Sequence, residues 1–176
     1  MIKMFDNVLT PDEYQVISGI IYGKPNWTWG ARTDGTVEDS ARLWQVNFKD
    51  FDGVVNPQIQ EIWENIKYRL NLKDKYEILQ VYANGQTYMM DGDWHTDSDD
   101  NGKTTFLYYF TEGDENIIGD TEFNMNGEII NVKPKTNTAI LFPSNILHRG
   151  RGPKKEFKDL RITIAFKLLT KDKSLI

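Results

Sequence analysis

The sequence predicts a mainly β fold with N-terminal helices (α+β), in which an antiparallel double sheet packs against the helices. Six short runs rich in β-branched or aromatic residues support this prediction: YEILQVYA, TTFLYYFT, TEFNM, EIINV, TAILFP and LRITIAFKL. Turn residues separate these runs from residue 76 onward, and no helical pattern lies between them. The dipeptide Asn126-Gly127, between the third and fourth runs, is a strong hairpin signal. Strands at this spacing favour a sandwich or a barrel over a parallel sheet.

Two amphipathic helices are predicted before this β region. Thr10 is the expected N-cap of the first, TPDEYQVISGIIYG, and Asn56 is that of the second, NPQIQEIWENIKYRL. Each helix carries an apolar stripe: Val16, Ile17, Ile20 and Ile21 in the first, and Ile59, Ile62, Trp63, Ile66 and Leu70 in the second. The remainder of this part is expected to be loop. We therefore predict a single domain over residues 1–176, with a helical and loop support region at 1–75 and a β core at 76–168.

Composition excludes several classes of function. The chain has 176 residues, no cysteine and a formal net charge of −5, so disulfides and thiolate metal sites are excluded. The one dense basic stretch, residues 148–161, is interrupted by acids, which disfavours nucleic acid as a partner. No apolar run reaches membrane-spanning length and no signal peptide is evident, so we expect a cytoplasmic protein without a membrane partner.

The only two histidines are candidate metal ligands. His95 lies in DGDWHTDSDD, two residues before Asp97, so both side chains project from one face if the segment is extended. His148 follows the later run TAILFP, which a sheet can place beside the first segment. Two imidazoles and one carboxylate, with open positions opposite, suit ferrous iron. Zinc accepts the same ligands, and the alternative is that both histidines are structural and Asp97 is solvated.

A calcium loop is a rival interpretation of the same segment. Asp97, Asp99, Asn101 and Gly102 match the opening of an EF-hand loop. The twelfth position of that loop needs a bidentate glutamate, and here it is Tyr108. The following residues also indicate a strand where an EF-hand has a helix. Calcium is therefore the weaker interpretation.

The last run carries a candidate anion-binding residue. In this strand Ile162, Ile164 and Phe166 are expected to point one way, and Arg161, Thr163 and Ala165 the other. A guanidinium in a pocket can hold a carboxylate through paired, charge-assisted hydrogen bonds, and Thr163 can add a hydroxyl. The alternative is a surface arginine within the basic stretch.

Taken in order, these segments resemble the iron(II)- and 2-oxoglutarate-dependent oxygenases, in particular the prolyl 4-hydroxylase-like branch. The resemblance covers residues 76–168. LQVYANGQTYMMDGDWHTD resembles the tyrosine-containing strand, glycine turn and H-x-D motif of the family, and TTFLYYFTEGDENIIGDTEFN resembles the strand and acidic loop that follow. TAILFPSNILHRG resembles the strand before the distal histidine, and LRITIAFKL resembles the last strand with its basic residue.

The resemblance implies a double-stranded β-helix (jelly roll, cupin-like) with the active site in residues 76–168. It implies Fe(2+) ligands at His95, Asp97 and His148, and a site for 2-oxoglutarate at Arg161, Tyr82 and Thr163. It also implies O2 as a cosubstrate and ascorbate as a candidate reductant. The implied reaction is hydroxylation of an unactivated carbon, with oxidative decarboxylation of 2-oxoglutarate to succinate and CO2.

Two departures from the family pattern concern the cosubstrate site. The animal and plant collagen-type enzymes carry lysine at the position of Arg161, so arginine indicates another sub-branch. The stretch between Tyr82 and His95 is also a few residues longer than usual, which bears on the assignment of Tyr82.

The resemblance makes a peptidyl proline the expected substrate. Trp27, Trp29 and Arg32 are candidate substrate contacts, because tryptophan and arginine are typical anchors for peptides. The alternative is that the tryptophans only pack the helices onto the sheet. A free amino acid or another small molecule is the second substrate class. A non-catalytic jelly-roll module and a zinc-binding one, such as a zinc hydrolase, are the alternatives to an oxygenase.

Overall fold

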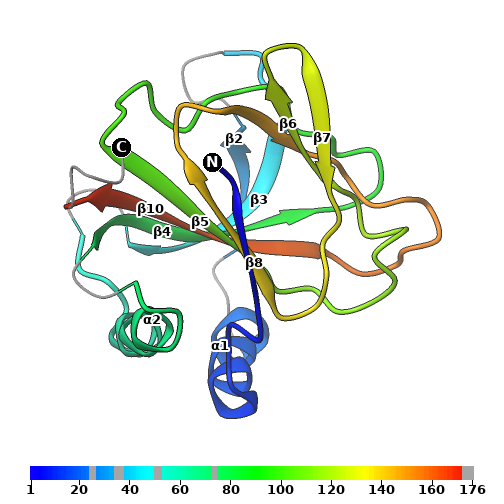
Figure 1. Ribbon diagram of the computed structural model, residues 1–176. Coiled ribbons are helices and arrows are strands. Elements are labelled where there is room, and N and C mark those ends of the chain that lie inside the picture. The colour runs from blue at the N-terminus through cyan, green and yellow to red at the C-terminus, as the bar shows by residue number, and fades with distance from the viewer. Residues whose placement is uncertain (24–26, 34–37, 50–52, 73–74, 172–176) are drawn as a thin grey trace.

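The computed structural model describes residues 1–23, 27–33, 38–49, 53–72 and 75–171. Their strands form two antiparallel sheets (Figure 1). The larger sheet has the order β1 (Lys3–Asp6), β8 (Thr138–Pro143), β5 (Lys103–Tyr109), β10 (Arg161–Thr170), β4 (Tyr76–Gln86), β3 (Arg42–Lys49) and β2 (Thr28–Arg32). The smaller sheet has the order β7 (Glu128–Val132), β6 (Thr121–Met125) and β9 (Leu147–Gly150). The predicted mainly β architecture with N-terminal helices is confirmed.

Both predicted helices form, and both begin at the predicted caps. At the start of α1 (Pro11–Gly23), the Glu13 N–H donates to Thr10 Oγ1 at 3.3 Å and the Thr10 N–H donates to Glu13 Oε2 at 2.8 Å. This reciprocal pair is a capping box. At the start of α2 (Pro57–Arg69), Asn56 Oδ1 accepts from the N–H groups of Gln58 and Ile59 at 3.0 and 3.3 Å. Both helices lie against the outer face of the larger sheet (Figure 1).

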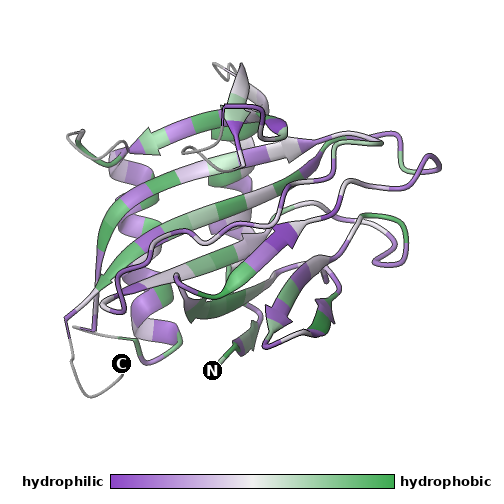
Figure 2. Cartoon of the chain, turned by 90° about the horizontal axis from the view of Figure 1, so that it is seen from above, coloured by the Kyte–Doolittle hydropathy of each residue, from purple (hydrophilic) through white to green (hydrophobic). Residues whose placement is uncertain are grey.

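Two hydrophobic cores hold these layers together. The first lies between the helices and the larger sheet, where Trp63 of α2 stacks on Phe166 of β10 with ring centroids 4.9 Å apart. The second lies between the two sheets and includes Phe123 and Phe142, whose rings meet edge to face at 4.9 Å. Strands of the larger sheet alternate between hydrophobic and hydrophilic residues along their length (Figure 2). This alternation supplies an apolar face to the helices, while the other face carries polar residues and, on β5 and β8, the apolar residues of the second core.

Part of the N-terminal support region is strand, which corrects the prediction of helix and loop for residues 1–75. Strands β2 and β3 extend the larger sheet beyond β4, and β1 pairs with β8 at its other edge. The run RLWQVNFK alternates in its second half, where Val46 and Phe48 are buried, so it carries a strand signal that the prediction overlooked. Main-chain hydrogen bonds pair this strand, β3, with the long strand β4. Residues 24–26, 34–37, 50–52 and 73–74 of this region lie outside the described residues.

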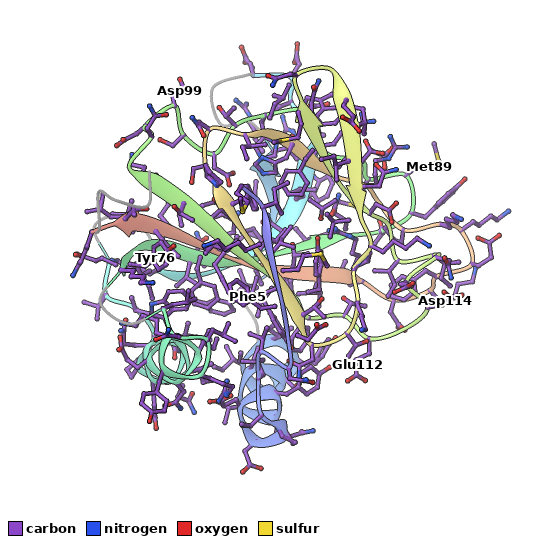
Figure 3. All side chains as sticks on the ribbon, viewed as in Figure 1. Phe5, Tyr76, Met89, Asp99, Glu112 and Asp114 are labelled. Atoms are coloured by element: carbon purple, nitrogen blue, oxygen red, sulfur yellow. The ribbon has the colours of Figure 1, made fainter. Side chains whose placement is uncertain are left out.

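The predicted hairpin at Asn126-Gly127 is confirmed. It joins β6 to β7, and its two residues have φ values of 57° and 97°. Positive φ at both central positions fits a type I′ turn, for which Asn-Gly is preferred. Loop residues such as Met89, Asp99 and Asp114 lie at the periphery of the molecule (Figure 3). Within the described residues, no helix has both the length and the apolar character needed to cross a membrane.

Candidate active site

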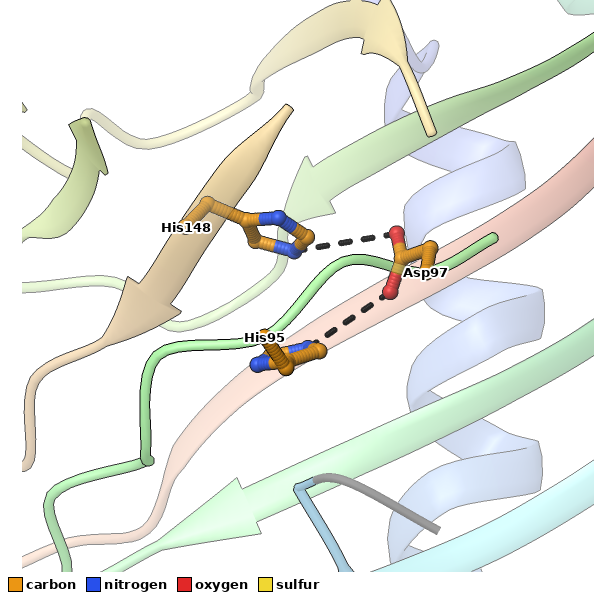
Figure 4. A group of neighbouring side chains, drawn as sticks. All are labelled: His95, Asp97 and His148. Atoms are coloured by element: carbon orange, nitrogen blue, oxygen red, sulfur yellow. Dashed lines mark ion pairs between the residues drawn. The ribbon is translucent and has the colours of Figure 1, made fainter. Parts of the chain in front are cut away.

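His95, Asp97 and His148 meet at one point between the two sheets (Figure 4). His95 Nε2 lies 3.5 Å from Asp97 Oδ1, and His148 Nε2 lies 3.7 Å from Asp97 Oδ2. One nitrogen or oxygen atom from each residue lies within 4.8 Å of the others. The backbone aligns the two histidines, because the His95 N–H donates to the His148 carbonyl at 3.0 Å and the His148 N–H donates back at 2.9 Å.

Backbone carbonyls set the tautomer of both rings. Nδ1 lies 2.9 Å from the Asp93 carbonyl in His95 and 2.8 Å from the Ile146 carbonyl in His148. A carbonyl only accepts, so each Nδ1 carries a proton, and Nε2 of each ring is the atom left to act as a ligand toward Asp97. Burial lowers the pKa of His148 to about 4, so this ring is neutral at pH 7. Two lone pairs and a carboxylate that face one another are suited to a divalent cation.

Asp97 is held as an anion by two side chains of the larger sheet. Thr105 Oγ1 donates to Asp97 Oδ2 at 2.5 Å, and Lys167 Nζ forms an ion pair with the same oxygen. The Asp97 N–H donates to the Ser144 carbonyl at 2.8 Å, which fixes the backbone at this point. Burial alone would raise the pKa of Asp97, but the nearby cation of Lys167 outweighs it and holds that pKa well below its ordinary value.

Arg161 is a buried cation in the same cavity. Its side chain donates to Gln86 Oε1 at 2.6 Å, to the Gly119 carbonyl at 3.1 Å and to Thr121 Oγ1 at 3.3 Å. The residue is 2% exposed, and none of the ion pairs between described residues involves it. Burial lowers its pKa, with opposing contributions from Tyr109 and Asp120. A guanidinium held by neutral groups in a closed site attracts an anion, because desolvation leaves its charge uncompensated.

The cavity that contains these groups also contains the two other predicted cosubstrate residues. Tyr82 of β4 and Thr163 of β10 both line it, between the larger sheet and the histidines. Burial raises the pKa of Tyr82, so its phenol is protonated and able to donate. The predicted alternation of the last strand is confirmed: Ile162, Ile164 and Phe166 lie in the core beneath the helices, and Arg161, Thr163 and Ala165 line the cavity.

The three predicted substrate contacts separate in space. Arg32 lines the cavity. Trp27 packs against the core beneath the helices, and its indole N–H donates to the Ile21 carbonyl at 3.4 Å. Trp29 is exposed and packs against Trp44 with ring centroids 5.3 Å apart, and it does not belong to the cavity lining.

Several cavity residues escaped the sequence analysis, and Lys167, Gln86 and Thr105 are the ones that contact its predicted site residues. The alternation of β10 extends from Arg161 to Lys167, so the same pattern that placed Arg161 could have found Lys167. Gln86 lies four residues after Tyr82 on the same face of β4, so alternation along β4 could have found Gln86 in the same way. Thr105 carries no such signal, because threonine is an ordinary strand residue.

The calcium interpretation loses its support in the structure. The residues after Gly102 form β5, which includes Tyr108, so no helix follows the loop. Within the loop, the Gly102 N–H donates to Asp100 Oδ1 at 2.8 Å. Among the described residues, the only group of three or more histidine and acidic side chains close enough to share an ion is His95, Asp97 and His148.

Comparison with solved structures identifies the same architecture in oxygenases. A viral collagen prolyl hydroxylase from Paramecium Bursaria Chlorella virus-1, in complex with 2-oxoglutarate, has a TM-score of 0.66 at 21% identity, covering 96% of both chains. A Trichoplax adhaerens prolyl hydroxylase in complex with a hypoxia-inducible-factor peptide has 0.70 at 13%, covering 97% of this chain and 84% of that one. HygX from Streptomyces hygroscopicus, with nickel, 2-oxoglutarate and hygromycin B bound, has 0.69 at 10%, covering 97% and 83%.

These similarities show that the chain has the double-stranded β-helix fold of the 2-oxoglutarate/Fe(II) oxygenases. The predicted jelly roll is thereby confirmed, and so is the family resemblance at the level of the fold. No protein-family model and no curated protein sequence matches the chain.

Proposed function

We propose that this protein is an iron(II)- and 2-oxoglutarate-dependent dioxygenase that hydroxylates an unactivated carbon. The observation that carries the proposal is the single cavity in which His95, Asp97 and His148 converge beside a buried Arg161. The first three supply ligand atoms for a divalent cation, and Arg161 supplies a cation for a carboxylate. Bound Fe(II) supplies oxygen activation coupled to decarboxylation of 2-oxoglutarate to succinate and CO2.

Residues of the chain itself bind the ion, fix the histidine tautomers and bind the cosubstrate. Nε2 of both histidines and one carboxylate oxygen of Asp97 hold the ion, and the carbonyls of Asp93 and Ile146 keep the rings in the required tautomer. Arg161 binds the carboxylate of 2-oxoglutarate that is remote from the ion, with Thr163 and the Tyr82 phenol as further donors. Burial of Arg161 and Thr163 excludes water from the charged contacts, which strengthens them.

We propose a peptidyl proline as the substrate. Two of the similar structures are prolyl hydroxylases, and one of these is bound to a peptide fragment. Arg32 at the cavity is the residue of this chain that we assign to substrate contact. The second candidate is a small molecule, because HygX has the same fold and is bound to hygromycin B.

Oxygen-dependent succinate formation tests the proposed activity. The purified protein should convert 2-oxoglutarate to succinate with Fe(II) and ascorbate in air and not under nitrogen, and His95→Ala should abolish this turnover. Succinate formation that is independent of oxygen, or equal in His95→Ala, would contradict the proposal. An array of proline-containing and proline-free peptides, together with free amino acids, then identifies the substrate class by a mass gain of one oxygen atom. Hydroxylation of free amino acids alone would favour the second candidate.

A further inference from the structure

Strand β7 (Glu128–Val132) is an outer strand of the smaller sheet, and its far edge has no partner among the described residues (Figure 1). An edge strand presents unpaired N–H and C=O groups to which a further strand can bind. Four of its five residues are exposed, among them Ile129 at 46% and Ile130 at 39%. Strand β7 therefore combines an open edge with exposed β-branched side chains.

The other sheet edges in the described part of the chain are covered, irregular or short. Strand β9, at the opposite side of the smaller sheet, is bridged by the segment at His95. The pairing of β2 with β3 shifts register at Gly30, and β1 has only four residues, two of which are charged. Bulges, short length and charge all protect an edge from further pairing. Strand β7 keeps a regular register with β6, has no proline, and has one charged residue, Glu128, at its first position.

The register of the β6–β7 hairpin decides which main-chain groups of β7 reach the open edge. Met125 and Glu128 flank its two-residue turn and therefore form a hydrogen-bonded pair. Hydrogen-bonded and non-hydrogen-bonded pairs alternate along an antiparallel ladder, so Ile130 is the next residue of β7 that bonds to β6. Ile129 and Asn131 thus direct their N–H and C=O groups outward. Among the described residues, no turn or loop hydrogen bond occupies these groups.

The charges at the two ends of β7 make the strand complementary to itself. Glu128 begins the strand and Lys133 follows it, and none of the ion pairs between described residues involves either of them. Lys133 Nζ donates to a neutral group, Asn116 Oδ1, at 2.6 Å. When two copies of β7 pair antiparallel, the acidic end of each strand lies beside the basic end of the other. Such a pairing is favourable at both ends.

We propose that β7 is a self-association surface, through which two copies of this chain pair antiparallel and join their smaller sheets into one. With a two-fold axis beside Ile130, Ile129 of each copy faces Asn131 of the other, and the two residues exchange both main-chain hydrogen bonds. The same axis places Ile130 opposite its own counterpart, where two apolar side chains meet. This interface does not depend on the proposed activity, because β7 contributes no residue to the cavity.

Sedimentation equilibrium over a range of protein concentrations tests this surface. The wild type should move from monomer to dimer as its concentration rises. Asn131→Pro should raise the dissociation constant about tenfold or more, because proline removes an outward N–H group from each copy and leaves the hydrogen bonds to β6 in place. Glu128→Lys and Lys133→Glu should each weaken the dimer by placing like charges together, and the double variant should restore it. Val54→Lys, at an apolar position that is 92% exposed, is the control and should not change the association.

Hydrogen exchange identifies the surface directly. The N–H groups of Ile129 and Asn131 should exchange more slowly in concentrated than in dilute solution, while that of Ile130 should change little, because it bonds to β6 in monomer and dimer alike. A wild type that stays monomeric up to about 1 mM would overturn the proposal. A dimer that Asn131→Pro and both charge variants leave intact would do the same, since the copies would then associate elsewhere. Should Asn131→Pro not fold, the two charge variants and their combination decide.

Discussion

The two faces of strand β10 differ in what they bury. On the face toward the helices, Ile162, Ile164, Phe166 and Leu168 are buried in an apolar core. On the opposite face, Arg161 and Lys167 carry charge into a cavity beside Asp97. Consecutive residues of one strand therefore serve two tasks, because a pleated strand sends successive side chains to opposite sides.

Because the two faces of β10 differ in this way, its helix-facing residues contribute to stability and its cavity-facing residues contribute to ligand binding. Burial of apolar side chains beneath the helices favours folding, and this region is apolar enough that the Trp63 indole N–H has no hydrogen-bond partner there. Burial of Arg161 costs free energy, since its charge is removed from water. Substitutions on the helix-facing side should therefore change the free energy of unfolding, and those on the cavity side should change ligand affinity.

Phe166→Ala is expected to have the largest effect, a loss of about 3–5 kcal/mol in the free energy of unfolding. The ring stacks on Trp63 at 4.9 Å and meets Phe106 edge to face at 6.0 Å, so its removal leaves a cavity in the core. Urea unfolding followed by circular dichroism measures the change. Leu169→Ala on the same strand, at a site that is 36% exposed, is the control and should cost much less. Equal losses in the two variants would contradict the contrast between buried and exposed positions.

His95→Ala should have the opposite effect to Phe166→Ala: it should lower metal affinity and change the free energy of unfolding little. Removal of a direct ligand should weaken Mn(II) binding by more than the roughly 10–100-fold that loss of a supporting residue costs. The side chain is 15% exposed and lies outside both hydrophobic cores, so the midpoint of urea unfolding should shift little. Thr96→Ala is the neighbouring control, since Thr96 Oγ1 donates to Asp99 at 3.2 Å. Unchanged Mn(II) affinity in His95→Ala would remove this histidine from the proposed site.

Glu13→Gln tests the ion pair between the two helices that cover this side of the sheet. It should lower the free energy of unfolding by about 1 kcal/mol. Both Glu13 carboxylate oxygens lie 2.9 Å from Arg69 Nη2, which links α1 to α2. Burial alone would raise the pKa of Glu13, but Arg69 and the Thr10 N–H outweigh it, so the pKa is lowered in the folded state. The carboxylate therefore stabilises the fold above its unfolded pKa, and this stabilisation disappears as the pH falls through the folded value.

The difference between wild type and Glu13→Gln should thus be largest at neutral pH and shrink in acid. Urea unfolding at a series of pH values measures it. Glu64→Gln is the control, because Glu64 pairs with Lys67 at 2.8 Å at a more exposed position and should matter less. A difference that grows toward low pH would show that the carboxylate is not stabilising.

The predicted and unpredicted strands show which elements a local sequence pattern can identify. The six predicted runs and both helices form, since each has its own periodicity, and the caps at Thr10 and Asn56 act through hydrogen bonds within one turn. Strand β9 was not predicted, because LHRG has no alternation of its own and is strand only through its pairing with β6. For the same reason β1 and β2 could not be found: an edge strand is defined by the neighbour that accepts its hydrogen bonds.

By itself, the sequence determined which residues share a strand face, where the helices begin, and which few side chains can hold a metal. The first two properties depend on contacts between residues a few positions apart, and the third depends on residue type alone. The tertiary structure alone decided that His148 lies opposite His95, that Thr105 and Lys167 share one oxygen of Asp97, and that Gln86 supports Arg161. The pairing and packing of two sheets set those contacts, because alternation orients a side chain and only the partner strand decides what it meets.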